Sequence, residues 1–324
     1  MKSLLVSWLA AASLLAAAPP PAAQAQSVST SPMKLIVGAS PGGSTDMLAR
    51  GIADELGRAM GRPVVVENKA GAGGKLAALE VARSTPDGTT LLVSFTSHTI
   101  NAALFRKPGY DPVADFTPIT LLAKVSSVLV ARPDHPAKDL RDLAARAKTD
   151  GQDLVFAIGG TGSSLHMDTY EFAAATGLKV TQVPFKGTSP AVTDVMAGHV
   201  DLMFAPVGTT RTLLEAGKLR ALAVTGPTRV PVLAQTPPIT DAVPNYTSNQ
   251  GWFGVLGPAG MPPELTARIH AGILKALSDS KLRARLEADG SIVDGSGTEA
   301  FTAFLESDLK HRVSQVKAFG IEPE

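Results

Sequence analysis

The chain has 324 residues, 44% of them hydrophobic, which is enough for two domains because a single core stops growing near ~250–300 residues. It has no cysteine, which excludes disulfides and a lipid-modified cysteine at a processed N-terminus. With 30 Lys and Arg against 29 Asp and Glu, it lacks the basic excess of a nucleic-acid-binding protein, so small molecules are the expected ligands.

The N-terminal residues 1–25 have the pattern of a secretory signal peptide. Lys2 supplies a positive charge, Leu4–Ala18 is a short apolar run, and Ala23-Gln24-Ala25 is a small-x-small cleavage site. The apolar run ends at Pro19-Pro20-Pro21 and is shorter than the roughly 20 residues of a membrane helix. We therefore expect cleavage after Ala25 and export of a soluble protein.

After this leader, apolar runs of strand length alternate with helical patterns. The runs are almost continuously hydrophobic, as in strands covered on both faces, and comprise Lys34–Gly38, Pro63–Asn68, Thr90–Phe95, Asp153–Gly159, Val180–Phe185, Asp201–Ala205, Arg220–Gly226 and Phe253–Pro258. Apolar residues recur at helical spacing in Leu48–Met60, Leu265–Leu277 and Phe301–Leu309. The alternation predicts an α/β fold with largely parallel sheets.

Two regions are interpreted as crossings between lobes, Leu121–Arg132 and Thr225–Pro238. They divide the chain into a first lobe made of residues 26–125 and 229–324 and a second lobe made of residues 126–228. A ligand would bind in the cleft between the lobes.

A glycine-rich turn follows the first predicted strand. Gly42 and Gly43 allow a sharp turn with exposed N–H groups, and Ser44 can cap the helix that follows. The start of such a helix is an anion site and suits a carboxylate. Asp46 would repel an anion, so we interpret it as a residue that orders the loop, although the ammonium group of an amino-acid ligand could also meet it.

A second turn of the same kind lies in Leu154–His166, where Thr161, Ser163 and Ser164 add hydroxyl donors. Two such turns could hold a ligand between two helix N-termini, each favouring negative charge by ~0.3–1 kcal/mol. Turns of this kind also close the chain in α/β proteins that bind nothing there. Two side chains near these turns also have alternative roles. His166 either contacts the ligand or packs in the protein interior, and Lys186 either contacts the ligand or is simply solvated.

Motifs for nucleotides, metals and catalysis are absent. Gly71–Lys75 resembles the end of a P-loop, but Lys69 and Leu76 occupy positions that require Gly and Ser or Thr. The histidines have no metal-ligand spacing, and there is no G-x-S-x-G nucleophile motif. We expect no cofactor, no metal and no catalysis. The enzyme alternative is a secreted α/β hydrolase that uses Ser163 or Ser164 with His166.

Several stretches together resemble the periplasmic solute-binding proteins of tripartite tricarboxylate transporters, often called Bug proteins. They are SPGGSTDMLAR, VVVENKAGAGG, TPDGTTLL, GGTGSSLH, VPFKGTSPAVTDVMAGHVDLMF, AGKLRALAVTG and WFGVLGPAGMPPE, in this order along the chain. The resemblance implies a two-lobed periplasmic-binding-protein fold, with a sheet flanked by helices in each lobe, that closes on its ligand. It also implies a periplasmic location, a small carboxylate or amino acid as ligand, and membrane permease subunits as partners. A monomer is expected, and a sensor for a membrane signalling partner would have the same fold and site.

The resemblance also implies where the ligand binds. The first binding loop is Ser40–Asp46, the second is Gly160–His166, and Lys186-Gly187 and Phe204–Pro206 form cleft walls. The expected ligand-binding residues are Ser40, Gly42, Gly43, Ser44, Asp46, Gly160, Thr161, Gly162, Ser163, Ser164, His166, Lys186, Gly187, Ala205 and Pro206. Gly38-Ala39-Ser40 and Gly73–Ala77 depart from the family pattern, which leaves the identity of the ligand open.

Overall fold

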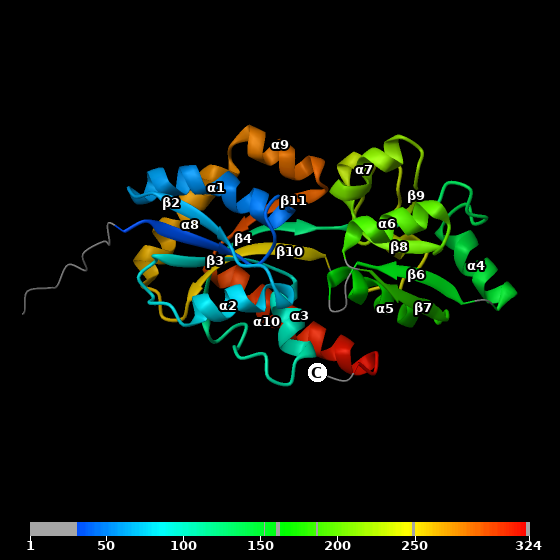
Figure 1. Cartoon of the computed structure of the whole chain (residues 1–324), viewed down its shortest axis with the longest axis horizontal. Coiled ribbons are helices and arrows are strands. Elements are labelled where there is room, and N and C mark those ends of the chain that lie inside the picture. Colours follow the sequence, from blue (N-terminus) through cyan, green and yellow to red (C-terminus); the bar gives the residue numbers. More distant parts are fainter. Residues whose placement is uncertain (1–30, 152, 160–162, 186, 248–249, 322–324) are drawn as a thin grey trace, which may run out of the picture. The chain divides into compact units, whose positions relative to one another are not determined.

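The computed structural model describes residues 31–151, 153–159, 163–185, 187–247 and 250–321. Within them the chain forms two sheets, each covered by helices on both faces (Figure 1). The expected α/β architecture of two helix-flanked sheets is therefore confirmed. No helix in the described residues is both long enough and apolar enough to span a membrane.

The first sheet has the strand order β11-β4-β10-β3-β1-β2. Its strands are β1 (Met33–Val37), β2 (Val64–Asn68), β3 (Thr90–Phe95), β4 (Phe116–Val125), β10 (Gly251–Pro258) and β11 (Ser291–Ser296). β1 runs parallel to β2 and β3, whereas β10 is antiparallel to β3 and β4, and β11 is antiparallel to β4.

Side chains of successive residues enter the two cores of this sheet alternately. Leu35 and Val37 pack with α1 (Ser44–Met60), α8 (Pro263–Leu277) and α9 (Ser280–Ala288). Ile36 packs on the opposite face with α2 (Lys75–Ala82) and α10 (Thr298–Ala318), and α3 (Ser97–Leu104) lies against α10. Figure 1 shows α1 and α8 on one side of the sheet and α2 and α10 on the other. The period of two is that of a strand buried on both faces.

The second sheet has the order β7-β6-β8-β5-β9. Its strands are β5 (Ser127–Ala131), β6 (Leu154–Ile158), β7 (Val180–Pro184), β8 (Leu202–Pro206) and β9 (Arg220–Val224). One face packs on α4 (Leu140–Asp150) and α5 (Ser164–Thr176), and the other on α6 (Thr188–Ala197) and α7 (Val207–Glu215).

The strands and helices predicted from hydrophobic patterns are all present, but the prediction of largely parallel sheets is wrong. Both sheets are mixed, since β5 is antiparallel to β8 and β9 while β6 is parallel to β7 and β8. β4 and β5 were not predicted as strands and are separated only by Ser126. Two neighbouring parallel strands of one sheet must be joined by a crossover of a dozen or more residues. β4 and β5 lie in different sheets, so the chain enters the second sheet at β5 without such a crossover, and β5 runs antiparallel to its neighbours β8 and β9.

The chain passes between the sheets at Ser126 and again in the segment between β9 and β10, which contains the short 3-10 helices η2 (Pro231–Leu233) and η3 (Ile239–Asp241). These passages touch: Gln250 Nε2 donates to Ser126 Oγ at 3.0 Å. A Cβ atom at Gly226 would lie 2.5 Å from the same Ser126 Oγ. Hence Ser126, Gly226 and Gln250 meet in a tightly packed junction.

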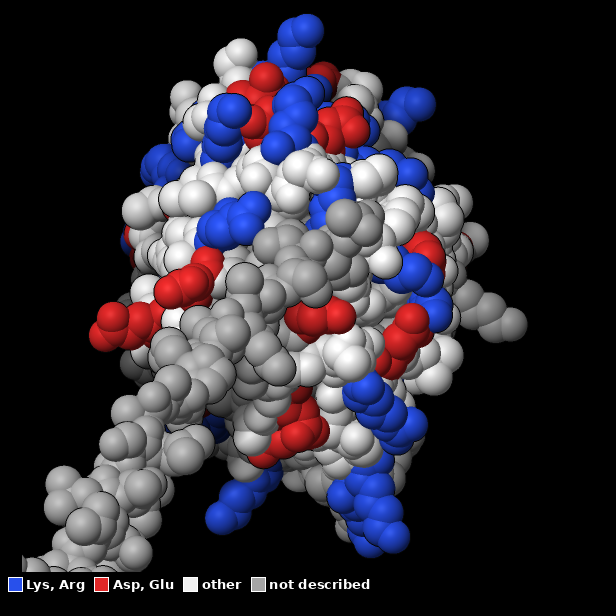
Figure 2. Space-filling model, turned by 90° about the vertical axis from the view of Figure 1, so that its left-hand side faces the viewer, with Lys and Arg blue, Asp and Glu red and all other residues white. Residues whose placement is uncertain are grey.

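Surface charge is mixed in sign. On the face shown in Figure 2, Lys and Arg side chains are interspersed with Asp and Glu. Ion pairs elsewhere in the structure include Lys34 with Glu67 at 2.9 Å and Arg146 with Asp142 at 2.9 Å. This face does not present the single-sign surface that a nucleic acid requires.

Candidate functional site

The predicted binding loops follow strands whose carboxyl ends lie at the junction between the sheets. In the first sheet, β10 begins beside the end of β3, where Phe253 pairs with Phe95, and Gly251 pairs with Val125 at the end of β4. In the second sheet, Pro206 at the end of β8 pairs with Ser127. Open α/β sheets bind ligands outside the carboxyl ends of their strands. The predicted loops therefore lie at the edges where such a site is expected.

The first loop joins β1 to α1, and its residues from Ser40 to Ser44 are exposed. Gly42 has φ +83°, a left-handed conformation that favours glycine. α1 begins at Ser44, and its N-cap is Gly43, which has no side chain to bond the first helical N–H groups. The expectation that Ser44 caps the helix is therefore wrong, because Ser44 is already the first helical residue. The first N–H groups of α1 thus lack a side-chain cap, at the positive end of a 17-residue helix.

Asp46 lies beneath this loop and is 3% exposed. Its Oδ2 accepts from the Gly42 N–H at 2.9 Å and from Arg50 Nε at 2.9 Å, and its Oδ1 accepts from Asn68 Nδ2 at 3.0 Å. The hydrogen bond from Arg50 is the main reason that the pKa of Asp46 falls to about 2. These contacts agree with the interpretation of Asp46 as a residue that orders the loop.

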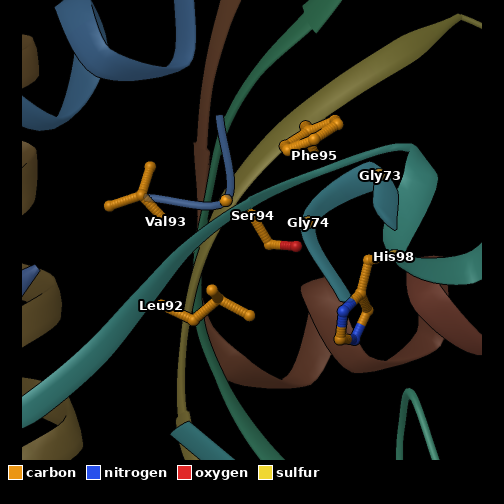
Figure 3. Close-up of a pocket in the computed structure, with 8 residues that line it drawn as sticks. Gly73, Gly74, Leu92, Val93, Ser94, Phe95 and His98 are labelled. Carbon is orange, nitrogen blue, oxygen red and sulfur yellow. The ribbon is translucent and has the colours of Figure 1, made fainter. Parts of the chain in front are cut away.

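A small hollow lies where the end of β1, β3 and the short helix η1 (Ala72–Gly74) meet (Figure 3). A Cβ atom at Gly38 would lie 2.8 Å from the Gly74 Cα, so the two backbones can approach closely only because residue 38 is glycine. His98 lines the hollow and donates its Nε2–H to the Pro112 carbonyl at 3.0 Å. Burial lowers the pKa of His98 to about 4, so the ring is neutral at pH 7.

The second loop joins β6 to α5, and its predicted residues Gly160, Thr161 and Gly162 lie outside the described residues. Ser163 is the N-cap of α5, and its Oγ accepts from the His166 N–H at 3.2 Å. Ser164 is the first helical residue and half-buried. His166 is 6% exposed, the centroid of its ring lies 4.7 Å from that of Tyr170, and burial lowers the pKa of His166.

The turn after β7 lies beside the second loop. A Cβ atom at Gly159 would lie 3.3 Å from the Thr188 nitrogen, at the start of α6. Gly187, the N-cap of α6, has φ +111° and again offers no side-chain cap. Lys186 lies outside the described residues. The second sheet therefore brings the end of β6, which leads to α5, against the start of α6.

The end of β8 is the neighbouring wall. Pro206 is half-buried and is the N-cap of α7. The Ala205 side chain is fully buried in the core under α6 and α7, so this residue could reach a ligand only through its backbone.

This geometry suits anion binding by backbone amides. In the part of the chain that the structure describes, no group of three His, Asp or Glu residues is arranged to hold a metal ion. Ser163 Oγ serves as a helix cap, which is the ordinary role of a serine at this position.

Sequence reasoning missed Arg50 and Asn68, which hold Asp46 in place. The spacing of Asp46 and Arg50 is the i, i+4 spacing of a helical ion pair, a signal that was available in the sequence. Asn68 gave no such signal, because its contact depends on the pairing of β1 with β2.

Comparison with known proteins places the chain in a family. Residues 48–320 match the sequence profile of the tripartite tricarboxylate transporter family receptors, TctC. The protein BugT of Bordetella pertussis is 30% identical over 292 residues, which are 89% of this chain and 89% of BugT.

Two solved structures from Rhodopseudomonas palustris are similar in sequence and in fold. MatC, solved with bound malate, is 32% identical with a TM-score of 0.75 over 88% of this chain and 98% of MatC. A second protein, solved with adipate, is 33% identical with a TM-score of 0.79 over 90% of this chain and 98% of that one. The resemblance to the Bug proteins is thereby confirmed, and the chain belongs to the tripartite tricarboxylate transporter receptor (TctC) family.

Proposed function

We propose that this protein is an extracytoplasmic receptor that captures a small carboxylate between two lobes and delivers it to the permease of a tripartite tricarboxylate transporter. The observation that carries the proposal is the start of α1. Exposed backbone, a glycine N-cap and a helix dipole converge there at the carboxyl edge of the first sheet.

The ligand class is a small carboxylate. Two relatives of similar fold were solved with malate and with adipate, both of which carry two carboxyl groups. In this chain the two ends of such a ligand would meet the start of α1 in one lobe and the starts of α5 and α6 in the other. The proposed ligand-binding residues are those named from the sequence, with Asp46 acting through the loop and Ala205 through its backbone.

Closure of two lobes is the proposed mechanism. The first lobe comprises residues 26–125 and 229–324 and the second comprises residues 126–228, and the assignment of the strands to two sheets supports this division as far as β9 and again from β10 onward. Between these strands, Ile239, Val243 and Tyr246 pack instead in a core of the second sheet, so the return to the first lobe lies after Tyr246. A ligand that touches both lobes stabilises the closed form, because the open form lacks half of the contacts. The protein performs no chemistry on its ligand.

The proposal extends to location and assembly. Residues 1–25 act as a signal peptide cleaved after Ala25, and the mature protein works in the periplasm as a monomer that meets membrane permease subunits. Cleavage is tested by mass spectrometry of the protein recovered from a periplasmic fraction. The assembly state is tested by light scattering.

The hydrolase alternative is disfavoured because Ser163 Oγ caps α5. A fluorophosphonate probe would label a nucleophilic serine, and we expect no labelling. A sensor for a membrane signalling partner would use the same site. Capture of membrane proteins with the ligand-loaded protein distinguishes the two roles, because a transporter would yield permease subunits and a sensor would yield a signalling protein.

The sharpest test of the site places a competing anion in it. Gly43 has φ −78° and ψ 171°, which any residue adopts, and a Cβ atom there would lie no closer than 3.7 Å to another heavy atom. Asp is a preferred N-cap, so Gly43→Asp should keep or raise stability while its carboxylate occupies the N–H groups of α1. We expect calorimetry with malate and adipate to show at least a tenfold loss of affinity, on the order of 1.4 kcal/mol.

Gly43→Asn is the matched control, because it can cap the helix without a charge. Binding in Gly43→Asn that clearly exceeds binding in Gly43→Asp would assign the loss to repulsion of an anionic ligand. Equal affinities in the wild type and Gly43→Asp would refute the location of the site.

A further inference from the structure

We infer that Arg50 and Asn68 are positioning residues of the first loop, which act through Asp46 to hold the loop amides in their binding arrangement. This inference deepens the proposed function and rests on it for its effect on the ligand. Neither Arg50 nor Asn68 belongs to the set expected from the sequence or implied by the family resemblance.

Asn68 ties together the two ends of the loop. Its Nδ2 donates to the Ala39 carbonyl, before the turn, and to Asp46 Oδ1, after the turn, each at 3.0 Å. Asn68 is the last residue of β2, which pairs in register with β1. The loop is therefore fastened to the sheet itself rather than only to its own helix.

Arg50 fixes Asp46 from the other side. Its Nε lies 2.9 Å from Asp46 Oδ2 and 3.1 Å from Oδ1, and its Nη2 donates to Asn68 Oδ1 at 3.2 Å. Asp46 Oδ2 in turn accepts from the Gly42 N–H. These contacts form a closed set that leads from β2 through α1 to the backbone of the turn.

The charge of Arg50 matters as much as its hydrogen bonds. A carboxylate beneath the start of α1 would oppose an anionic ligand, and Asp46 remains ionised because its pKa lies near 2. The guanidinium in contact with it offsets that charge. The loop is thus ordered by an acidic group without becoming repulsive to an anion.

An alternative is that the three residues only stabilise the fold. The side chain of Arg50 is 55% exposed but that of Asp46 is only 5% exposed, so loss of Arg50 also lowers stability by leaving a buried carboxylate without its main partner. A purely structural role would change the unfolding temperature alone, whereas a positioning role also changes the order of the loop and the affinity for ligand.

The experiment compares Arg50→Gln, Asn68→Ala and Asp46→Asn with the wild type in two measurements. Hydrogen exchange of loop residues 40–46 without ligand reports their order. Calorimetry with malate and adipate reports affinity. Arg58→Gln is the matched control, because Arg58 lies on the same helix, pairs with Glu55 and is 68% exposed.

We expect loop exchange to rise and affinity to fall, each by about tenfold, in the Arg50 and Asn68 variants, since these variants remove hydrogen bonds to a charged group. Arg58→Gln should change neither quantity. The double variant Arg50→Gln/Asp46→Asn should bind more tightly than Arg50→Gln alone, because it removes the carboxylate that the single variant leaves unpaired.

Unchanged exchange in Arg50→Gln and Asn68→Ala would overturn the positioning role, whatever happens to affinity. If Asp46→Asn does not fold, these two variants still decide the question. If the wild type binds neither malate nor adipate, the proposed function fails for these ligands, and the exchange of the loop alone decides whether Arg50 and Asn68 position it.

Discussion

Asp168 gives the molecule a measurable and unusual dependence of stability on pH. This carboxyl group on α5 is 4% exposed, and Tyr246 donates its hydroxyl to Asp168 Oδ1 at 3.3 Å. Burial raises the pKa of Asp168 to about 7, aided by the negative charge of Glu171. Ser127, Arg312 and Tyr246 act in the opposite direction without overcoming burial.

The sign follows from which state holds the proton. The unfolded chain loses the Asp168 proton near pH 3.8, whereas the folded chain keeps it until about pH 7. The folded state therefore binds more protons between these values, and its stability falls as the pH rises through this range. At ~1.4 kcal/mol for each unit of pKa, the loss amounts to about 4 kcal/mol between pH 4 and pH 8.

The assay is urea unfolding of the wild type and Asp168→Asn at several values between pH 4 and pH 8. The difference between the two free energies of unfolding isolates Asp168 from other titrating groups. Asn retains an oxygen for the Tyr246 hydroxyl but has no charge. We expect the wild type to lose about 4 kcal/mol relative to Asp168→Asn as the pH rises.

The control is Asp54→Asn, at an exposed position on α1, whose free energy of unfolding relative to the wild type should show no such dependence on pH. A difference between wild type and Asp168→Asn that stays constant from pH 4 to pH 8 would show that the folded protein does not hold the Asp168 proton, and the reasoning from burial would be wrong.

Two further predictions concern stability. Burial lowers the pKa of His98 to about 4, so the wild type should gain about 3 kcal/mol over His98→Gln as the pH rises from 4 to 6.5; urea unfolding that shows no gain would contradict this. Gly226→Ala should lower the free energy of unfolding by ~1–3 kcal/mol in thermal unfolding, because the new Cβ would lie 2.5 Å from Ser126 Oγ. An unchanged unfolding temperature would mean that Ser126 moves aside without cost.

The fold was predictable where hydrophobic runs were long and continuous. Most residues of β1, β3 and β10 are buried on one or the other face of the sheet, so the amino-acid types alone indicate buried strands. β11 was not predictable, because the edge sequence SIVDGS has few apolar residues. The strand directions were also inaccessible, because they depend on which sheet each strand joins after the chain passes from β4 to β5 at Ser126.

The site was predictable as a pair of turns but not as a structure. Glycines between a strand and a helix indicated the first loop, and the structure has that loop exposed at the start of α1. The cap was placed one residue too late, because helix ends depend on geometry that residue types do not fix. The contacts of Asn68 could not be foreseen, since they join segments 22 and 29 residues apart.

The proposed binding mode also bears on selectivity. Backbone N–H groups at the start of a helix donate to any carboxylate in much the same way. Contacts with the two carboxylates of a ligand therefore do not distinguish one dicarboxylate from another. Discrimination must come from the distance between the two loops and from the side chains that line it. Ser40 lies at the exposed start of the first loop. A receptor built in this way can change its ligand through such a residue while Asp46, Arg50 and Asn68 keep the loop itself unchanged.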